Sequence, residues 1–201
     1  MPRFGWRYFA SKPADWWNPP EPGPFEKAQL DSIRQLIEGR APKSILEIGV
    51  GRGRATGWFR GEWSYVGVEV NAKLLEDARL RDGGPFLVGT GTHLPVKDGR
   101  FEAVVAFDVF MHIWDRHAFL QECRRVLSPN GSLVINYLRR FSRGWRSYVL
   151  SHVVHPATTW KARDRRFDSQ GDMRKLLLSA KFSPEFFMVD TSVPFLIGRR
   201  T

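Results

Sequence analysis

Three glycines at alternate positions follow a short apolar run that carries one acid. The run Ile45–Ile48 contains Glu47, and Gly49, Gly51 and Gly53 come directly after it. Glycine permits positive φ angles, and it lets the main chain approach a ligand closely where a side chain would interfere. The pattern therefore predicts a buried strand that opens into a tight loop with accessible backbone.

A second acid, Glu69, ends the next apolar run, Tyr65–Glu69. Doubly wound α/β sheets hold the hydroxyl groups of a ribose with an acid about twenty residues after a glycine-rich turn. Together the two motifs predict a site for a ligand shaped like adenosine. Nicotinamide-dependent dehydrogenases share this opening, but their fingerprint has a glycine three residues after the second one. That position is Arg54 here, so a dehydrogenase is the poorer interpretation.

Alternating strands and helices must position these residues. The spacing of apolar residues predicts strands at 44–48, 64–69, 85–88, 101–107 and 131–138, and helices near 25–39, 54–60, 71–81 and 116–127. Such alternation is typical of a parallel sheet with right-handed crossovers. Asn130 and Gly131 supply the turn into the fifth strand.

The C-terminal part departs from this alternation. Asp168 or Ser169 is expected to cap a helix whose apolar face holds Met173, Leu176, Leu177 and Ala180. Two further β-rich runs, 182–189 and 193–198, are separated by three residues, so they are expected to form an antiparallel hairpin. The predicted fold class is α/β: a Rossmann-like, doubly wound, mostly parallel seven-stranded sheet with an antiparallel C-terminal hairpin.

Composition limits the class of protein. A length of 201 residues suits one domain with a substantial core, and the single cysteine, Cys123, excludes an internal disulfide. Cys123 falls in a predicted helix, where a buried packing role is expected rather than a nucleophilic one. No apolar run is long enough to cross a bilayer, and the N-terminus lacks the apolar core of a signal peptide, so a cytoplasmic location is expected. The five histidines are scattered and predict no metal site.

Residues 1–24 are rich in Trp, Phe and Pro. Because prolines oppose a regular helix, we expect an extended arm that packs over the domain. The arm either closes the site as a lid or only covers apolar surface. The remaining residues, 25–201, are expected to form the functional domain.

Five motifs occur in one order along the chain: Glu47-x-Gly49-x-Gly51-x-Gly53, Glu69, Leu94-Pro95, Phe101–Ile113 and Arg125–Leu133. Their order and spacing resemble those of class I S-adenosylmethionine-dependent methyltransferases, in particular the small-molecule branch that includes ubiquinone and menaquinone methyltransferases. The resemblance covers residues 26–138, and residues 167–200 by topology. In the last motif Asn130 replaces the first glycine of the family's Arg-Val-Leu-x-Pro-Gly-Gly turn.

The resemblance implies S-adenosyl-L-methionine as cofactor and S-adenosyl-L-homocysteine as product. It places a set of residues against the cofactor: Glu47, Gly49, Gly51, Gly53, Glu69, Val70, Thr90, Gly91, Thr92, Phe107 and Asp108. Thr90 stands where relatives commonly carry an acid that binds the adenine amino group. Asp108 either lies beside the cofactor and takes part in catalysis or caps the next helix. His112 could act as a general base or line the pocket near the methyl group.

The segment 139–166 holds eight basic residues and one acidic residue, whereas the basic and acidic residues of 45–138 cancel. Family members insert substrate-binding elements at this place, so Arg143, Trp145, Arg146 and Tyr148 are candidate acceptor-binding residues. Arginine interleaved with aromatic residues suits anionic groups or nucleotides. Residues 145–154 could also form a helix that lies on an anionic membrane surface, or a lid helix with solvated charges.

Three functions stay open at this point. The first is methyl transfer to a small, anionic or lipid-like acceptor. The second is methylation of RNA through the basic segment, although no Asn-Pro-Pro-Tyr-type motif follows the fourth strand, where residues 108–111 stand. The third is a non-catalytic module that binds the cofactor, because a fold does not establish an activity.

Overall fold

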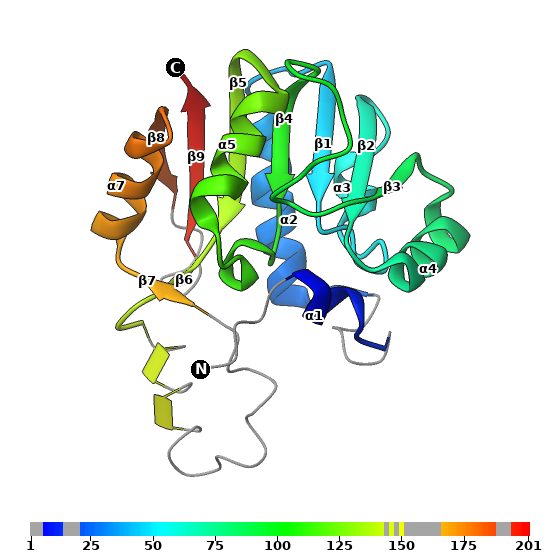
Figure 1. The fold of residues 1–201 in the computed structure, drawn as a ribbon, viewed down its shortest axis with the longest axis horizontal. Helices are drawn as coiled ribbons and strands as arrows, with labels where there is room; N and C mark the ends of the chain where they lie inside the picture. Colours follow the sequence, from blue (N-terminus) through cyan, green and yellow to red (C-terminus); the bar gives the residue numbers. More distant parts are fainter. Residues whose placement is uncertain (1–5, 14–20, 143–144, 147–148, 151–165, 188–193) are drawn as a thin grey trace.

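Five strands form the parallel part of a seven-stranded sheet in the computed structural model (Figure 1). They are β1 (Ser44–Ile48), β2 (Ser64–Glu69), β3 (Phe86–Val88), β4 (Phe101–Ala106) and β5 (Leu127–Asn136). The sheet order is β3-β2-β1-β4-β5-β9-β8. The structure describes residues 6–13, 21–142, 145–146, 149–150, 166–187 and 194–201.

The last two strands run antiparallel, as predicted. Strand β8 (Phe182–Phe187) pairs only with β9 (Phe195–Arg200) in the described part of the sheet, and β9 lies antiparallel between β8 and β5. The predicted connection at 190–192 lies outside the described residues. The predicted fold class, a mostly parallel seven-stranded sheet with an antiparallel C-terminal pair, is confirmed.

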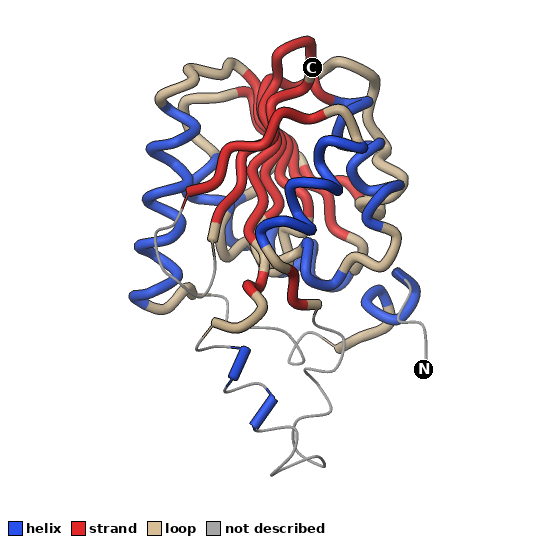
Figure 2. Tube along the Cα trace, turned by 90° about the vertical axis from the view of Figure 1, so that its left-hand side faces the viewer, coloured by secondary structure: helices blue, strands red, loops and turns tan. Residues whose placement is uncertain are grey.

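Helices cover both faces of the sheet (Figure 2). One face carries α2 (Pro24–Glu38), α3 (Thr56–Phe59) and α4 (Ala72–Asp82), and the other carries α5 (Arg116–Val126) and α7 (Gln170–Ser179). Side chains of a strand point to alternate faces, so Ile45 of β1 packs with the first group and Leu46 with the second. The strands are apolar on both faces because helices bury both.

The helix ends follow local sequence signals. Asn71, Asp115 and Ser169 each accept a hydrogen bond from a backbone N–H in the first turn of α4, α5 and α7. Ser169 is therefore the cap of α7, one of the two residues predicted for that role. Pro24 stands in the first turn of α2, where its missing N–H costs no intrahelical bond.

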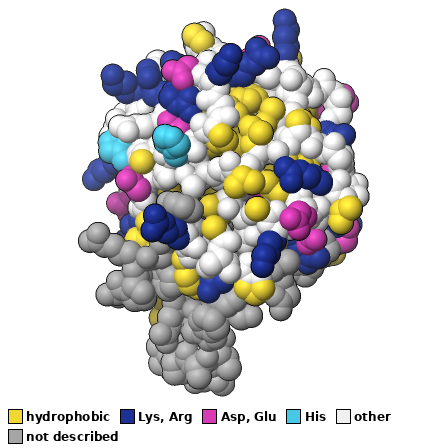
Figure 3. All heavy atoms as spheres, turned by 45° about the vertical axis from the view of Figure 1, so that its right-hand side comes forward, with side chains coloured by type: hydrophobic (Ala, Val, Ile, Leu, Met, Phe, Trp, Pro, Cys, Tyr) yellow, Lys and Arg dark blue, Asp and Glu magenta, His cyan; other side chains and the backbone are white. Residues whose placement is uncertain are grey.

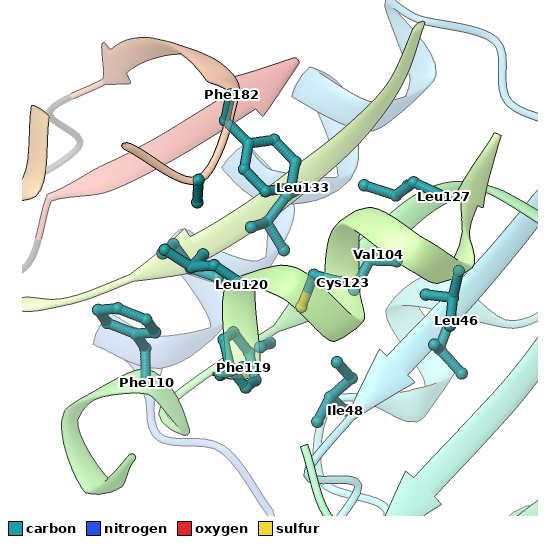
Figure 4. Packing of buried hydrophobic residues seen from close by; sticks show 14 of the residues in the cluster. Leu46, Ile48, Val104, Phe110, Phe119, Leu120, Cys123, Leu127, Leu133 and Phe182 are labelled. Atoms are coloured by element: carbon teal, nitrogen blue, oxygen red, sulfur yellow. The ribbon is translucent and has the colours of Figure 1, made fainter. Parts of the chain in front are cut away.

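Cys123 packs between α5 and the sheet. It is fully buried within the apolar cluster that Figure 4 draws, together with Leu46, Ile48 and Val104 from the strands. Burial raises the pKa of its thiol well above the ordinary value. The predicted packing role is confirmed.

The sequence predicts an extended N-terminal arm, but part of this region is helical. Residues Trp6–Ala10 form a short helix, α1, within the predicted arm 1–24. The prolines that argued against a helix lie outside this stretch, so its backbone bonds are intact. Figure 1 places α1 below the carboxyl ends of the parallel strands, where the arrows of β1, β2 and β4 point.

The fifth strand begins earlier than the predicted 131–138. Strand β5 starts at Leu127, and its register with β4 shifts between Phe101 and Ala103 because residues 128–131 form a bulge. Asn130 has a φ of 64°, which suits the turn residue that the sequence indicated. Leu138 is not part of this strand: it belongs to β6 (Leu138–Arg139), which pairs with β7 (Phe167–Asp168) in a separate two-stranded sheet.

The surface carries apolar as well as charged side chains. On the face drawn in Figure 3, hydrophobic side chains form a group at the centre and several Lys and Arg side chains lie along the upper edge. Leu80 of α4 and Val88 of β3 are among the large apolar side chains that are exposed. Within the described residues, every helix is too short or too polar to span a bilayer.

Candidate functional site

A cavity of about 300 Å³ lies at the carboxyl ends of β1, β2 and β4. Ligands of open α/β sheets bind at this edge, where neighbouring loops diverge. Most residues predicted from the sequence to contact the cofactor line it: Glu47, Gly49, Gly51, Glu69, Val70, Thr90, Gly91, Thr92, Phe107 and Asp108, together with His112. Gly53 is not among the lining residues.

The three glycines of the loop have different surroundings. Gly49 has a φ of 78°, and a Cβ there would lie 2.1 Å from Cγ2 of Val109. Gly53 has a φ of 81° and faces Ala78 of α4, so its role is to let the loop pack on that helix. Gly51 has a φ of 57° and lines the cavity, and an added Cβ would meet no protein atom within 4 Å. Only at Gly51 would a side chain project into the open space beside the cavity.

Glu69, at the end of β2, is 6% exposed and lines the cavity. Its two carboxylate oxygens accept separate backbone bonds at 2.9 Å, one from the N–H of Gly51 and one from the N–H of Asn71. Burial raises the pKa of Glu69, and the backbone donors oppose this rise. Each oxygen keeps a lone pair for a further donor, so the carboxylate can hold two hydroxyl groups of a ligand while it fixes the glycine loop.

Glu47 lies beneath the loop and is 1% exposed. Its carboxylate accepts hydrogen bonds from the hydroxyl groups of Tyr65 and Thr56, the latter at 3.2 Å. Burial raises the pKa of Glu47 to about 7 and also raises the pKa of Tyr65 above its usual value. Near neutral pH this acid is therefore only partly ionised.

Asp108 follows β4 and is held by two residues, Asn136 at the end of β5 and Arg54 in the loop after β1. Its N–H donates to Oδ1 of Asn136, and Nδ2 of Asn136 donates to its Oδ1, both at 2.7 Å. Its Oδ2 accepts from Nη2 of Arg54 at 2.9 Å, and Nη1 of Arg54 donates to Glu26 at 2.6 Å. Val109 and Asp115 occupy the cap positions of the next two helical segments, so the prediction that Asp108 caps the following helix is wrong.

The loop after β3 forms the wall of the cavity opposite Asp108 along the sheet. The hydroxyl oxygens of Thr90 and Thr92 lie 3.2 Å apart, and Thr90 forms a β-bridge with His93. A Cβ at Gly91 would lie 2.8 Å from the ring of Phe119, so packing alone requires glycine there. The two hydroxyl groups are side-chain polar groups that this wall offers where the family resemblance led us to expect an acid.

The remaining end of the cavity is apolar and aromatic. His112 ends the short 3₁₀ helix η2 (Phe110–His112), and its ring lies 5.5 Å from the ring of Phe9 in α1. Phe9, Ile113 and Trp114 also line this end, and the side chain of Trp114 is partly exposed. We call this group, made of Phe9, His112, Ile113 and Trp114, the aromatic end of the cavity.

The predicted acceptor-binding residues do not line the cavity in the described structure. Trp145 and Arg146 lie in a helical stretch, where the ring of Trp145 packs at 4.9 Å from that of Phe141. Arg143 and Tyr148 lie outside the described residues, as does most of the segment 139–166. Their role stays a prediction. In the described residues, no three or more His, Cys, Asp or Glu side chains gather as they would around a metal ion.

Sequence reasoning missed several residues of the site, among them Phe9, Arg54, Asn71 and Asn136. In the sequence, Arg54 is only a departure from the dehydrogenase fingerprint, and Asn71 only the start of a helix. The long-range hydrogen-bond partners of these residues lie between 28 and 62 residues away along the chain. The one local signal is that Arg54 directly follows the glycine loop and Asn71 directly follows the Glu69-Val70 pair.

Comparison with known proteins identifies the fold. Residues 46–135 match the family model described as "Methyltransferase domain". Demethylmenaquinone methyltransferase of Thermotoga maritima is 35% identical over 108 residues, which are 51% of this chain and 47% of that protein. Ubiquinone biosynthesis O-methyltransferase of Histophilus somni is 25% identical over 159 residues, 71% of this chain and 66% of that protein. The chain thus spans about half of the first relative and just under two thirds of the second.

Among solved structures, magnesium protoporphyrin IX methyltransferase from Synechocystis PCC 6803, determined with bound SAH, superposes with a TM-score of 0.73. The match covers 97% of each chain at 16% sequence identity, so it supports the fold alone. The family resemblance drawn from the five sequence motifs is confirmed by the family model and by these relatives.

Proposed function

From the class I, S-adenosylmethionine-dependent methyltransferase domain that this chain contains, we propose that it transfers a methyl group from S-adenosylmethionine to a small-molecule acceptor. The observation that carries the proposal is the pairing of Glu69 with Gly51. A buried carboxylate faces the same cavity as a glycine whose missing side chain leaves open space. This pair provides acceptors for ribose hydroxyl groups and room for the ligand beside them.

The charges around the cavity fit this cofactor. S-Adenosylmethionine carries a sulfonium, an ammonium and a carboxylate, so its net charge is positive. Although the chain has a net charge of +10, the Asp, Glu and Arg side chains that line the cavity are Glu69, Asp108, Asp115 and Glu47 against Arg52 and Arg54. Glu47 is only partly ionised near pH 7, because burial raises its pKa, so the acids exceed the bases by at least one charge. Arg52 is also paired with Asp77 at 2.8 Å. The cavity therefore favours a cationic ligand within a basic protein.

Each polar group of the cofactor has a matching group in this chain. Glu69 would accept the two ribose hydroxyl groups, and the hydroxyl groups of Thr90 and Thr92 would face the adenine. The Arg54–Asp108 ion pair presents a cation and an anion side by side, which suits the carboxylate and the ammonium of the amino-acid end. Two of the five N–H groups of Arg54 are engaged, by Glu26 and Asp108, so others are available for a carboxylate.

When bound, the cofactor supplies a methyl group on an electrophilic sulfonium. The residues of this chain then contribute chiefly by alignment of the acceptor, which is worth up to about 7–11 kcal/mol in well-oriented reactions. The aromatic end would hold an acceptor with an apolar ring or chain, in keeping with the quinone-related names of the two relatives. His112 lies at this end and would line the acceptor pocket or take a proton from the acceptor.

The test is calorimetric binding of S-adenosylmethionine and S-adenosylhomocysteine, followed by a mass-spectrometric methylation screen over metabolites, lipids and RNA. We expect both ligands to bind the wild-type protein. Glu69→Ala should weaken the affinity for each ligand at least about 100-fold, because two charge-assisted bonds of about 1.5–3 kcal/mol each are lost. Glu76→Ala removes an acid from an exposed position of α4 and should leave binding unchanged.

Three outcomes would overturn the proposal. If neither ligand binds the wild-type protein, the cavity does not serve this cofactor. If both ligands bind but no acceptor in the screen gains a methyl group, a non-catalytic cofactor-binding module is the better description. Methylation of RNA alone, with loss at moderate salt, would replace the small-molecule acceptor by a nucleic acid.

A further inference from the structure

A single buried residue joins the ribose-facing acid to the N-terminal helix, through its backbone N–H on one side and its side-chain amide on the other. Asn71 is fully buried between β2 and α4, and four hydrogen bonds involve its N–H or its side chain. Its N–H donates to Glu69 at 2.9 Å, and its Oδ1 accepts from the N–H of Lys73 at 3.1 Å. Its Nδ2 donates to the carbonyl oxygens of Phe9 at 3.2 Å and Lys12 at 2.8 Å.

These bonds divide into two functions. The bond from Lys73 is an ordinary N-cap of α4, which Ser, Thr or Asp could make equally well. The two bonds from Nδ2 reach about sixty residues back along the chain, to the end of α1 and the turn after it. They require an amide or another donor, so they explain why the cap residue is Asn.

The segment held in this way covers the cavity. Phe9 is buried, lines the cavity and places its ring against that of His112 at the aromatic end. Asn71 fixes the backbone oxygen of this same residue. Figure 1 shows α1 lying below the ends of the parallel strands and beside the start of α4.

We propose that Asn71 is a positioning residue that latches α1 over the aromatic end and couples this closure to occupation of Glu69. The inference rests on the proposed function and adds to it a way to retain the cofactor and shape the acceptor pocket. A ligand whose hydroxyl groups engage Glu69 holds this carboxylate in the position from which it accepts the backbone N–H of Asn71. It thereby restricts the backbone of Asn71, whose side-chain Nδ2 holds α1. By reciprocity, a latched α1 must strengthen ligand binding by the same factor.

The experiment separates the latch from the cap. Asn71→Ser and Asn71→Asp keep a side-chain oxygen for the cap but lack the amide donors, whereas Asn71→Ala loses both. The dissociation rate of S-adenosylhomocysteine is measured by stopped flow, and amide hydrogen exchange of Ser11 and Lys12 is measured in the ligand-free protein. The amides of Ser11 and Lys12 donate to the carbonyls of Arg7 and Phe9, so they report on α1 itself.

For a latch, the variants Asn71→Ser and Asn71→Asp should both release the ligand about 10-fold faster than wild type. The amides of Ser11 and Lys12 should also exchange faster in both variants, as in Asn71→Ala. The Ser and Asp variants differ in charge, so agreement between them excludes an electrostatic cause. If Asn71→Ser and Asn71→Asp behave as wild type and only Asn71→Ala differs, Asn71 acts as a helix cap alone and the proposal is overturned. If wild-type protein binds no ligand, the proposed function fails, and the exchange data alone decide whether the latch exists.

Discussion

Replacing Glu47 with Gln should remove a pH dependence of stability that this buried acid imposes. Burial raises its pKa from 4.5 to about 7 in the folded protein. Between these values the folded protein holds a proton that the unfolded chain has released, so the free energy of unfolding falls as the pH rises. At about 1.36 kcal/mol for each pH unit, the loss between pH 4.5 and pH 7 is about 3 kcal/mol.

Glutamine imitates the protonated acid at every pH. Its carbonyl oxygen can accept from Tyr65 and Thr56 as the carboxyl does, while its NH₂ group adds a buried donor. That donor costs about 1–3 kcal/mol if it finds no partner, so the absolute stability of the variant is a poor readout. The slope of stability against pH is the diagnostic quantity, because the cost of the added donor does not depend on pH.

The assay is urea unfolding of the ligand-free protein at intervals from pH 5 to pH 8. Wild type should lose about 3 kcal/mol more over this range than Glu47→Gln, and a smaller slope should persist because burial also raises the pKa of Glu69. Glu76→Gln removes the same charge from an exposed position and should keep the wild-type slope. Equal slopes in wild type and Glu47→Gln would show that Glu47 is already ionised in the folded protein, and the argument from burial would fail.

Three further predictions concern other parts of the structure. Arg54→Gln should weaken the binding of S-adenosylhomocysteine about 10-fold or more, as measured by calorimetry. The binding of 5′-methylthioadenosine, which lacks the amino-acid end, should stay unchanged. Equal weakening of both ligands would assign Arg54 a structural role. Gly49→Ala should lower the free energy of unfolding by about 2 kcal/mol or more, since φ is 78° and the new Cβ would lie 2.1 Å from Val109. A stability close to that of wild type in denaturant unfolding would contradict this. Cys123 should react with a thiol reagent only as fast as the protein unfolds, because it is fully buried with a raised thiol pKa; rapid labelling of the native protein would refute its packing role.

The sequence was most informative where the signal is local. The bounds of β1 and β2 and the cavity position of Glu69 follow from a short apolar run, a glycine or an acid within a few residues of each other. Helix α1 could not be predicted in this way, because five residues cannot form a stable helix alone and contacts with Asn71 hold it. The early start of β5 was not predicted for a related reason, because a bulge lets Leu127 pair with Phe101 before the turn at Asn130.

The sequence indicated Asp108 but not its partners Arg54 and Asn136, because these contacts join segments that are adjacent only in the folded sheet. β4 and β5 are neighbours in the sheet, so Asp108 and Asn136, which follow and end these strands, meet at its carboxyl edge. Asn136 occupies one oxygen of Asp108 and leaves the other to Arg54. The positive φ of Asp108, 57°, is unusual for a residue with a side chain, and the two bonds to Asn136 provide a local reason for it. This strained acid is fixed before any ligand arrives, so its position need not be organised at the cost of binding energy.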